Sequence, residues 1–190
     1  MKQSRVLNET EYKLVLSVCS TSRYPERDTC LVVLSYKLGL RVKELSSILI
    51  SDVIDDKGSL VEGFYLNPDQ TKGDDGRMVY LTNKQVRTSL QSYLVWCETS
   101  NITGSRLFWS QKGGHFSPES LSNWFSHLYK RCGLKGCSSH SGRRTFATSL
   151  IQKGYDIKSI SVLMGHSNIQ TTSRYINTNP VMLGDMVKGL

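Results

Sequence analysis

Two short segments of the sequence read as β-strands, whereas most of the remaining chain has helical spacing. They are LVEGFYL (60–66) and RMVYLT (77–82), both rich in β-branched and aromatic residues. The stretch between them contains the turn dipeptides Asn67-Pro68 and Asp75-Gly76. This pattern predicts one small antiparallel sheet, closed by a tight hairpin over 72–77, among helices.

Helices are predicted where apolar residues recur at helical spacing or capping residues mark a boundary. Gly39 and Gly154 stand where glycines end helices, and the polar stretch SDVIDDKGS (51–59) predicts a break. The predicted helices are Thr10–Val18, Arg27–Lys37, Asn83–Trp96, Ser117–Tyr129, Ser141–Gln152, Ile157–Leu163, Thr171–Asn177 and Val181–Val187. We therefore expect a mainly α fold with a small antiparallel β-sheet (α+β), in a single domain over 1–190.

The charge of the chain is unevenly distributed. Residues 104–190 hold 11 of the 24 Lys and Arg residues but 3 of the 16 Asp and Glu residues, so the whole excess of +8 lies there. A basic half of this kind favours a polyanion, and nucleic acid is the default candidate at a pI near 9.3. A basic face kept for solubility is the alternative that charge alone leaves open.

Cysteine content and hydropathy indicate the compartment. The five cysteines are odd in number and lack CxxC spacing, and no signal-peptide pattern opens the chain. No apolar run approaches the roughly 20 residues of a membrane helix. We therefore expect a reduced, cytoplasmic protein without a membrane partner.

Two segments carry residues suited to phosphodiester cleavage, which needs a nucleophile, positive charge around the phosphate and a proton donor. In LMGHSNIQTTSRY (163–175), a polar run precedes Tyr175, whose phenol, with an ordinary pKa near ~10, becomes a nucleophile beside cations and a base. In SSHSGRRTFATSL (138–150), His140 and Arg143 share one face at a helix start, where an anion is favoured. A partly buried tyrosine and a surface arginine are the alternatives.

Four motifs, in this order along the chain, resemble the catalytic domain of the tyrosine recombinases, the phage integrase family. They are LGLRVKEL, TKGDDGR, HSGRRTFAT and LMGHSNIQTTSRY, spread over Leu38 to Tyr175. Their combination is far more specific than any one motif. The resemblance implies the fold of that catalytic domain and a site-specific recombinase or integrase.

The resemblance implies a set of residues around the phosphate. Arg41 matches the first phosphate-binding arginine and Arg143 the second. His166 matches a position at which His or Trp hydrogen-bonds the phosphate. Glu44 matches the acidic residue that steadies the active-site histidine and arginine side chains.

The resemblance also implies which residues attack and move protons. Tyr175 matches the nucleophile, Lys72 the lysine that protonates the leaving 5′ oxygen, and His140 the histidine that helps to move the tyrosine proton. The implied reaction forms a 3′-phosphotyrosine link and frees a 5′ hydroxyl, which attacks the link in turn. Bond energy is conserved, so no cofactor and no metal are expected.

The sequence departs from the family pattern at a few points. Gly142 stands where a larger apolar residue is usual, and Arg144 where a histidine or arginine is frequent, so neither removes a catalytic group. About 40 residues precede Arg41, so we expect no N-terminal clamp domain.

The resemblance further implies double-stranded DNA as the partner and a homotetramer on DNA, formed from protomers that are monomers off DNA. A tail helix over 180–190 has the apolar face Met182, Leu183 and Met186. This face is a candidate for docking on a neighbouring protomer, with internal packing as the alternative.

Several basic residues extend the charged surface and are candidate contacts to backbone phosphates. They are Lys130, Arg131, Lys135 and Arg144. Cys132, Cys137 and His140 read C-x4-C-x2-H, but a fourth ligand at structural-site spacing is missing, so no zinc site is expected.

Two other functions stay open. A type IB topoisomerase uses a similar phosphotyrosine step but reseals the same strand as a monomer. A recombinase-like module that binds DNA without cleaving it would have no need for Tyr175 or Lys72.

Overall fold

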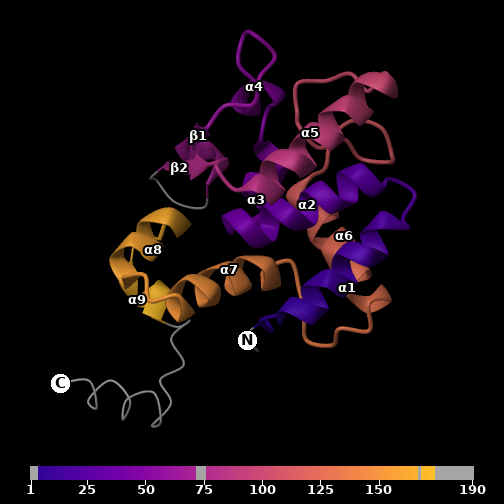
Figure 1. Ribbon diagram of the computed structural model, residues 1–190. Coiled ribbons are helices and arrows are strands. Elements are labelled where there is room, and N and C mark those ends of the chain that lie inside the picture. Colours follow the sequence, from indigo (N-terminus) through magenta and orange to yellow (C-terminus); the bar gives the residue numbers. More distant parts are fainter. Residues whose placement is uncertain (1–3, 72–75, 167, 174–190) are drawn as a thin grey trace, which may run out of the picture.

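The computed structural model describes residues 4–71, 76–166 and 168–173, and Figure 1 shows their arrangement. The α-helices are α1 (Glu9–Ser20), α2 (Pro25–Leu38), α3 (Val42–Ser47), α4 (Ile50–Val53), α5 (Lys84–Thr99), α6 (Pro118–Arg131), α7 (Ser141–Gln152), α8 (Ile157–Met164) and α9 (Ile169–Ser173). A short 3-10 helix, η1, covers Pro68–Gln70. Within these described ranges, no helix is long and apolar enough to cross a membrane.

The two predicted strands pair as expected. β1 (Gly63–Leu66) and β2 (Arg77–Tyr80) form a two-stranded antiparallel sheet in which Gly63 faces Tyr80 and Leu66 faces Arg77. Buried and exposed side chains alternate along β2, as they do on a sheet with one covered face. The prediction of a mainly α fold with a small antiparallel sheet is confirmed.

α2 forms the centre of the main core. Pro25 starts it in a favourable first-turn position, and Gly39 ends it in the left-handed conformation with φ 62°. Residues 30–34 are fully buried, because α1, α5 and α7 pack against α2 from different sides (Figure 1). The end of this rigid helix is where the candidate site begins.

α7 and α8 form a separate, smaller core. Its buried residues are Ala147, Ile160 and Met164, and they do not join the main cluster. α8 begins at the N-cap Asp156, whose carboxylate accepts the Ser159 main-chain N–H at 2.9 Å. In Figure 1, α8 lies beside the sheet and α9 lies below α8, both on the far side of α7 from α5 and α6.

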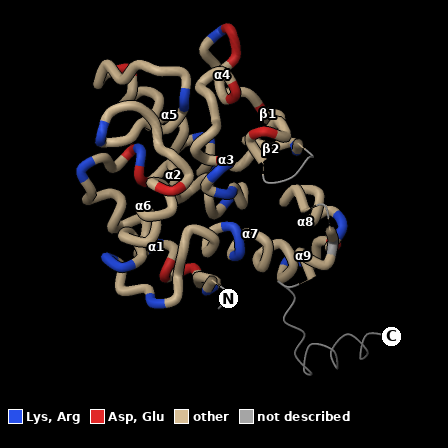
Figure 2. The backbone as a smooth tube through the Cα atoms, turned by 180° about the vertical axis from the view of Figure 1, so that it is seen from behind, with Lys and Arg blue, Asp and Glu red and all other residues tan. Residues whose placement is uncertain are grey.

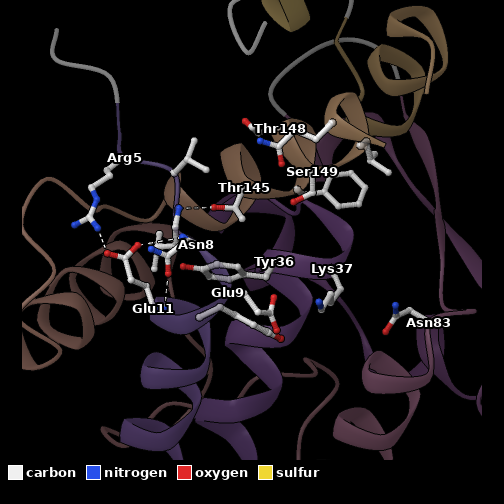
Figure 3. Close-up of a pocket in the computed structure, with 16 residues that line it drawn as sticks. Arg5, Asn8, Glu9, Glu11, Tyr36, Lys37, Asn83, Thr145, Thr148 and Ser149 are labelled. Carbon is white, nitrogen blue, oxygen red and sulfur yellow. Dashed lines mark hydrogen bonds and ion pairs between the residues drawn. The ribbon is translucent and has the colours of Figure 1, made fainter. Parts of the chain in front are cut away.

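The N-terminal segment packs against α7 beside a groove of about 760 Å³ (Figure 3). The Leu7 N–H donates to Thr145 Oγ1 at 3.1 Å, and Arg144 Nη1 donates to the Ser4 carbonyl at 2.8 Å. Arg5 forms an ion pair with Glu11 at the edge of this groove. The groove lies on the α1 side of α7, and none of the predicted catalytic residues that the structure describes, Arg41, His140, Arg143 and His166, lies in its wall.

One prediction is wrong in detail, because the expected break over 51–59 contains the end of α4. Asp52 stabilises this single turn by accepting the Leu49 N–H at 2.8 Å. Asp55 then organises the following turn by accepting the N–H groups of Lys57 and Ser59 at 2.9 and 2.8 Å. The polar composition of this stretch predicted an irregular segment, but its aspartates instead stabilise a helical turn and the turn that follows it.

Candidate active site

The site begins at the junction between α2 and α3. Arg41 is the N-cap of α3, and Glu44 lies one turn later with no exposed surface. The Arg41 main-chain N–H donates to Glu44 Oε2 at 2.7 Å, and Arg41 Nη1 donates to Oε1 at 2.8 Å. One buried carboxylate therefore fixes both the start of the helix and the Arg41 side chain.

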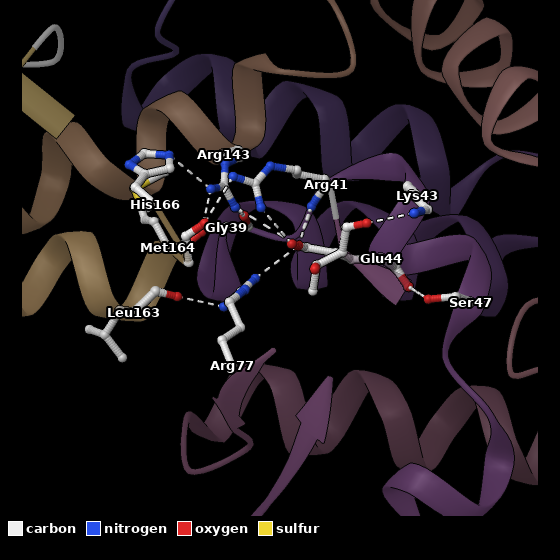
Figure 4. A network of polar contacts seen from close by, with 12 residues as sticks. Gly39, Arg41, Lys43, Glu44, Ser47, Arg77, Arg143, Leu163, Met164 and His166 are labelled. Atoms are coloured by element: carbon white, nitrogen blue, oxygen red, sulfur yellow. Dashed lines mark hydrogen bonds and ion pairs between the residues drawn. The ribbon is translucent and has the colours of Figure 1, made fainter. Parts of the chain in front are cut away.

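Two further arginines reach this carboxylate from other elements (Figure 4). Arg77, the first residue of β2, donates from Nη2 to Glu44 Oε2 at 2.9 Å. Arg143, in the first turn of α7, has Nη1 3.8 Å from the same oxygen and donates to the Gly39 carbonyl at 2.7 Å. Arg77 and Arg143 are only 5% and 3% exposed, so these interactions occur away from water.

These cations decide the ionisation of Glu44. Burial alone would raise the pKa of the Glu44 carboxyl, but Arg77, Arg143 and the Arg41 main-chain N–H together hold that pKa below its usual value. The carboxylate is therefore charged near neutral pH. It holds the guanidinium groups of three different elements in one place.

The same three arginines meet at the C-terminal end of α8, where the last main-chain carbonyls have no partner within the helix. Each arginine donates to the carbonyl of one of three successive residues. The pairs are Arg77–Leu163, Arg143–Met164 and Arg41–Gly165. Positive charge is favourable at a helix C-terminus, so the end of α8 helps to order the arginines.

His166 follows directly after Gly165, which turns the chain in the left-handed conformation with φ 57°. His166 Nε2 lies 3.0 Å from Nη2 of Arg143, and a guanidinium can only donate, so Nε2 accepts and the ring proton lies on Nδ1. Nδ1 then donates to Thr172 Oγ1 at 2.8 Å. Burial, followed by the charges of Arg143 and Arg41, lowers the pKa of His166 to about 3. The imidazole is thus neutral near pH 7.

His140 lies at the start of the helix that carries Arg143, as predicted. It is the N-cap of α7 and is exposed, and its main-chain N–H donates to Ser138 Oγ at 3.2 Å. The structure therefore brings Arg41, Glu44, Arg143 and His166 into one network. His140 stands on α7, one turn before Arg143.

Two predicted catalytic residues, Lys72 and Tyr175, lie outside the described residues, so their roles stay predictions. The apolar face of the predicted tail helix also lies outside them: Met182, Leu183 and Met186. Next to Lys72, the Thr71 carbonyl accepts a hydrogen bond from Lys43 Nζ at 2.5 Å. α9 ends at Ser173, two positions before Tyr175.

The candidate DNA contacts lie in two settings. Lys130, Arg131 and Lys135 are exposed, at or just after the end of α6, whereas Arg144 is half-buried and bonds the N-terminal segment. Figure 2 shows acidic residues at the loop after α4, away from α7 and α8. Contact of these four residues with DNA stays a prediction.

Cysteine chemistry has no support in the described part of the chain. Burial raises the pKa of the Cys132 and Cys137 thiols, which is the opposite of what an activated nucleophile needs. Among the same described residues, no group of His, Cys, Asp and Glu is arranged to hold a metal ion.

Arg77 is a member of the site that was not predicted from the sequence. The signal was present in RMVYL, because Arg77, Val79 and Leu81 fall on the inward face of the strand, where they are 5%, 2% and 0% exposed. A charged residue at an inward position needs a buried partner of opposite charge. That partner is Glu44.

The sequence profile described as the phage integrase family matches residues 5–181 of this chain. The chain belongs to the phage integrase family. Tyrosine recombinase XerC of Leptospira interrogans is 31% identical over 176 residues, which are 91% of this chain and 54% of that protein. The chain spans about half the length of the curated relatives that it matches.

Solved structures of the family have the same fold. The crystal structure of XerA recombinase is 28% identical, with a TM-score of 0.78 over 97% of this chain and 64% of that one. The catalytic domain of bacteriophage HP1 integrase is 22% identical, with a TM-score of 0.66 over 98% of this chain and 95% of that one. This chain therefore has the fold of a tyrosine recombinase catalytic domain, as its motifs predict.

Proposed function

We propose that this chain carries the strand-cleaving centre of a site-specific DNA recombinase that works through a 3′-phosphotyrosine intermediate. The observation that supports it most is the meeting of Arg41 and Arg143 beside an ionised Glu44 and a neutral His166. With Arg77, three guanidinium groups share one carboxylate, so the cluster keeps an excess of positive charge. Such an excess suits a phosphate, and still more the five-coordinate transition state.

In the proposed reaction, the Tyr175 phenolate oxygen forms a bond to the scissile phosphorus and the bond to the 5′ oxygen breaks. His140 helps to take the phenol proton, and Lys72 gives a proton to the leaving 5′ oxygen. Arg41 and Arg143 hold the non-bridging oxygens. A 5′ hydroxyl of another strand then reverses these steps, so one phosphodiester replaces another without an external energy source.

His166 must change its hydrogen bond when a phosphate arrives, because Nε2 has to donate to an oxygen instead of accepting from Arg143. The partner on the other ring nitrogen permits this. The Thr172 hydroxyl can accept from Nδ1–H, as it does here, or donate to a bare Nδ1. The site thus fits both tautomers of a neutral imidazole.

The proposed substrate is double-stranded DNA, and the proposed assembly is a homotetramer on two duplexes, formed from protomers that are monomers off DNA. The exposed basic residues after α6 would contact backbone phosphates and make binding salt-dependent. We place this activity in the cytoplasm. Light scattering with and without the target duplex tests the assembly.

Covalent trapping tests the chemistry. Wild type, Tyr175→Phe and the control Tyr155→Phe are incubated with nicked duplexes from the protein's own genomic neighbourhood, and adducts are separated on a denaturing gel. Tyr155 is a suitable control because it is an exposed tyrosine, at 59%, that belongs to none of the four motifs. We expect an adduct with wild type and Tyr155→Phe and none with Tyr175→Phe.

The other functions predict different results. Relaxation of a plasmid without defined sites would favour the topoisomerase. DNA binding without any adduct, unchanged in Tyr175→Phe, would favour a non-cleaving binder. An adduct that persists in Tyr175→Phe would refute the assigned nucleophile.

A further inference from the structure

Arg77 is the member of the arginine cluster that is enclosed by protein. Its two terminal nitrogens donate to Glu44 Oε2 and to the Leu163 carbonyl. Its stem lies against the turn after α8, where a Cβ on Gly165 would come within 2.6 Å of Arg77 Cδ. Figure 4 shows the guanidinium reaching between Glu44 and Leu163, toward the other two arginines. Arg77 therefore bridges α3 and α8 from the first residue of β2.

This position makes Arg77 unsuited to hold a phosphate itself. It is 5% exposed, and both Nη atoms are engaged in the protein. Arg41 differs because its side chain keeps 19% of its surface exposed. Arg143 is as buried as Arg77, at 3%, but its Nη2 also lies 3.0 Å from Nε2 of the half-buried His166, whereas the terminal nitrogens of Arg77 donate to Glu44 and Leu163. A buried arginine that cannot reach the substrate can still change the field and the geometry at the site.

Its effect follows from the charges that face Glu44. These are Arg41 from the start of α3, Arg77 from β2 and Arg143 from α7, with His166 after α8 also within electrostatic reach. Three guanidinium charges against one carboxylate leave an excess of two. Without Arg77 the excess positive charge is one. The buried Glu44 carboxylate would then be compensated only by Arg41 and Arg143, the two arginines proposed to bind the phosphate.

We propose that Arg77 is a positioning residue of this site: it compensates the Glu44 carboxylate and holds the end of α8, so that Arg41 and Arg143 remain directed at the scissile phosphate. The inference rests on the proposed function and extends it to a residue that contacts no substrate. Arg77 would thus lower the barrier to cleavage more than it strengthens DNA binding.

The test compares Arg77→Met, which keeps the stem and removes the charge, with Arg77→Lys, which keeps the charge and loses the two-sided bridge. Arg87→Met is the matched control, because Arg87 also donates to two main-chain carbonyls, of Val61 and Leu60, but faces no carboxylate of the site. The measurements are duplex affinity and the single-turnover rate of adduct formation, across pH 5 to 9.

We expect Arg77→Met to slow adduct formation by about 10- to 100-fold, as misplacement of reacting groups does, while duplex affinity changes by less than about threefold. The rate of adduct formation by Arg77→Lys should lie between the rates of Arg77→Met and wild type. As the pH is lowered, adduct formation by Arg77→Met should begin to slow at a higher pH than in wild type. The reason is that Glu44 protonates more easily once the Arg77 charge is gone. A rate for Arg77→Met within threefold of Arg87→Met, with the same pH profile, would overturn the inference.

A second readout does not need cleavage, and so separates this inference from the proposed function. The pKa of Glu44 is depressed in the folded chain, so its stabilising effect is lost as pH falls through that folded value. Arg77→Met should therefore unfold at a higher pH on acidification than Arg87→Met. In a Glu44→Gln background this difference should vanish. If wild type forms no adduct but the shift appears, the proposed function fails and the role of Arg77 in the cluster stands; if the shift is absent, that role fails.

Discussion

Replacement of Gly142 by alanine should destabilise the protein, although alanine is the better helix former. Gly142 lies in the first turn of α7, where α7 crosses α2. A Cβ built there would overlap the Ser35 hydroxyl, and it would lie 3.0 Å from Tyr36 Cδ2 and 3.1 Å from the Ser35 carbonyl carbon. The carbonyl carbon belongs to the α2 main chain, so it cannot swing aside as a side-chain tip can.

The magnitude follows from two opposing effects. Helix propensity favours alanine over glycine by up to about 1 kcal/mol. Overpacking in a buried contact costs about 1–3 kcal/mol. The net loss in the free energy of unfolding should therefore be about 0.5–2 kcal/mol, or a fall in Tm of roughly 1–8 °C for a chain of this size.

Ser35 provides the internal control for Gly142→Ala. Its hydroxyl is buried and has no hydrogen-bond partner in the part of the chain that the structure describes, so Ser35→Ala alone should be neutral or slightly stabilising. In the double variant the overlap with Oγ disappears, and we expect a favourable coupling of about 1 kcal/mol. The assay is urea denaturation of the four proteins in this cycle.

Two results would refute this reasoning. One is a Gly142→Ala variant at least as stable as wild type; the other is a cycle in which the two substitutions add without coupling. Catalysis provides a further check. If α7 moves outward, Arg143 loses its 2.7 Å bond to the Gly39 carbonyl, and adduct formation should slow more than the stability loss explains.

Two further predictions concern His166 and its partner. Thr172→Val removes the acceptor of the His166 Nδ1 proton inside the protein, so it should lower the free energy of unfolding in urea by about 1–3 kcal/mol. Thr171 is less buried, and Thr171→Val should change this free energy little. Equal effects of the two variants would contradict the assigned hydrogen bond. The pKa of His166 is about 3 in the folded chain, whereas the unfolded chain takes up this proton near pH 6.5. Lowering the pH below about 6.5 therefore reduces the free energy of unfolding. His166→Gln should remove up to about 1.4 kcal/mol per pH unit from that slope between about pH 6 and 4, and an unchanged slope would show that folding does not depress the pKa of this ring.

The sequence predicts the elements of this fold better than the contacts among them. Gly39, Gly154 and the two runs of β-branched and aromatic residues mark boundaries through local backbone preference, so the ends of α2 and α7 and the small sheet follow from neighbouring residues. α4 does not, because one turn stabilised by Asp52 looks like a polar break in composition.

The same distinction applies to the site. Motifs identify Arg41, Glu44, Arg143 and His166 as a set, and the structure places them in one network. Arg77 lies 33 positions after Glu44 and interacts with it only through tertiary packing. The three carbonyls that accept hydrogen bonds from the arginines are main-chain groups, so a pattern of side chains in the sequence cannot predict them.

The dependence of α8 on the arginines affects how variants of this chain are interpreted. α8 joins the main body through a small apolar cluster and through guanidinium groups on its last carbonyls. If these arginines bind a phosphate, as we propose, phosphate binding and packing of α8 use the same donors and are thermodynamically linked. Under the proposed function, removing Arg41 or Arg143 would take away a phosphate ligand and a hydrogen-bond donor to α8 at once, so we expect such variants to lose more activity than the phosphate contact alone would supply.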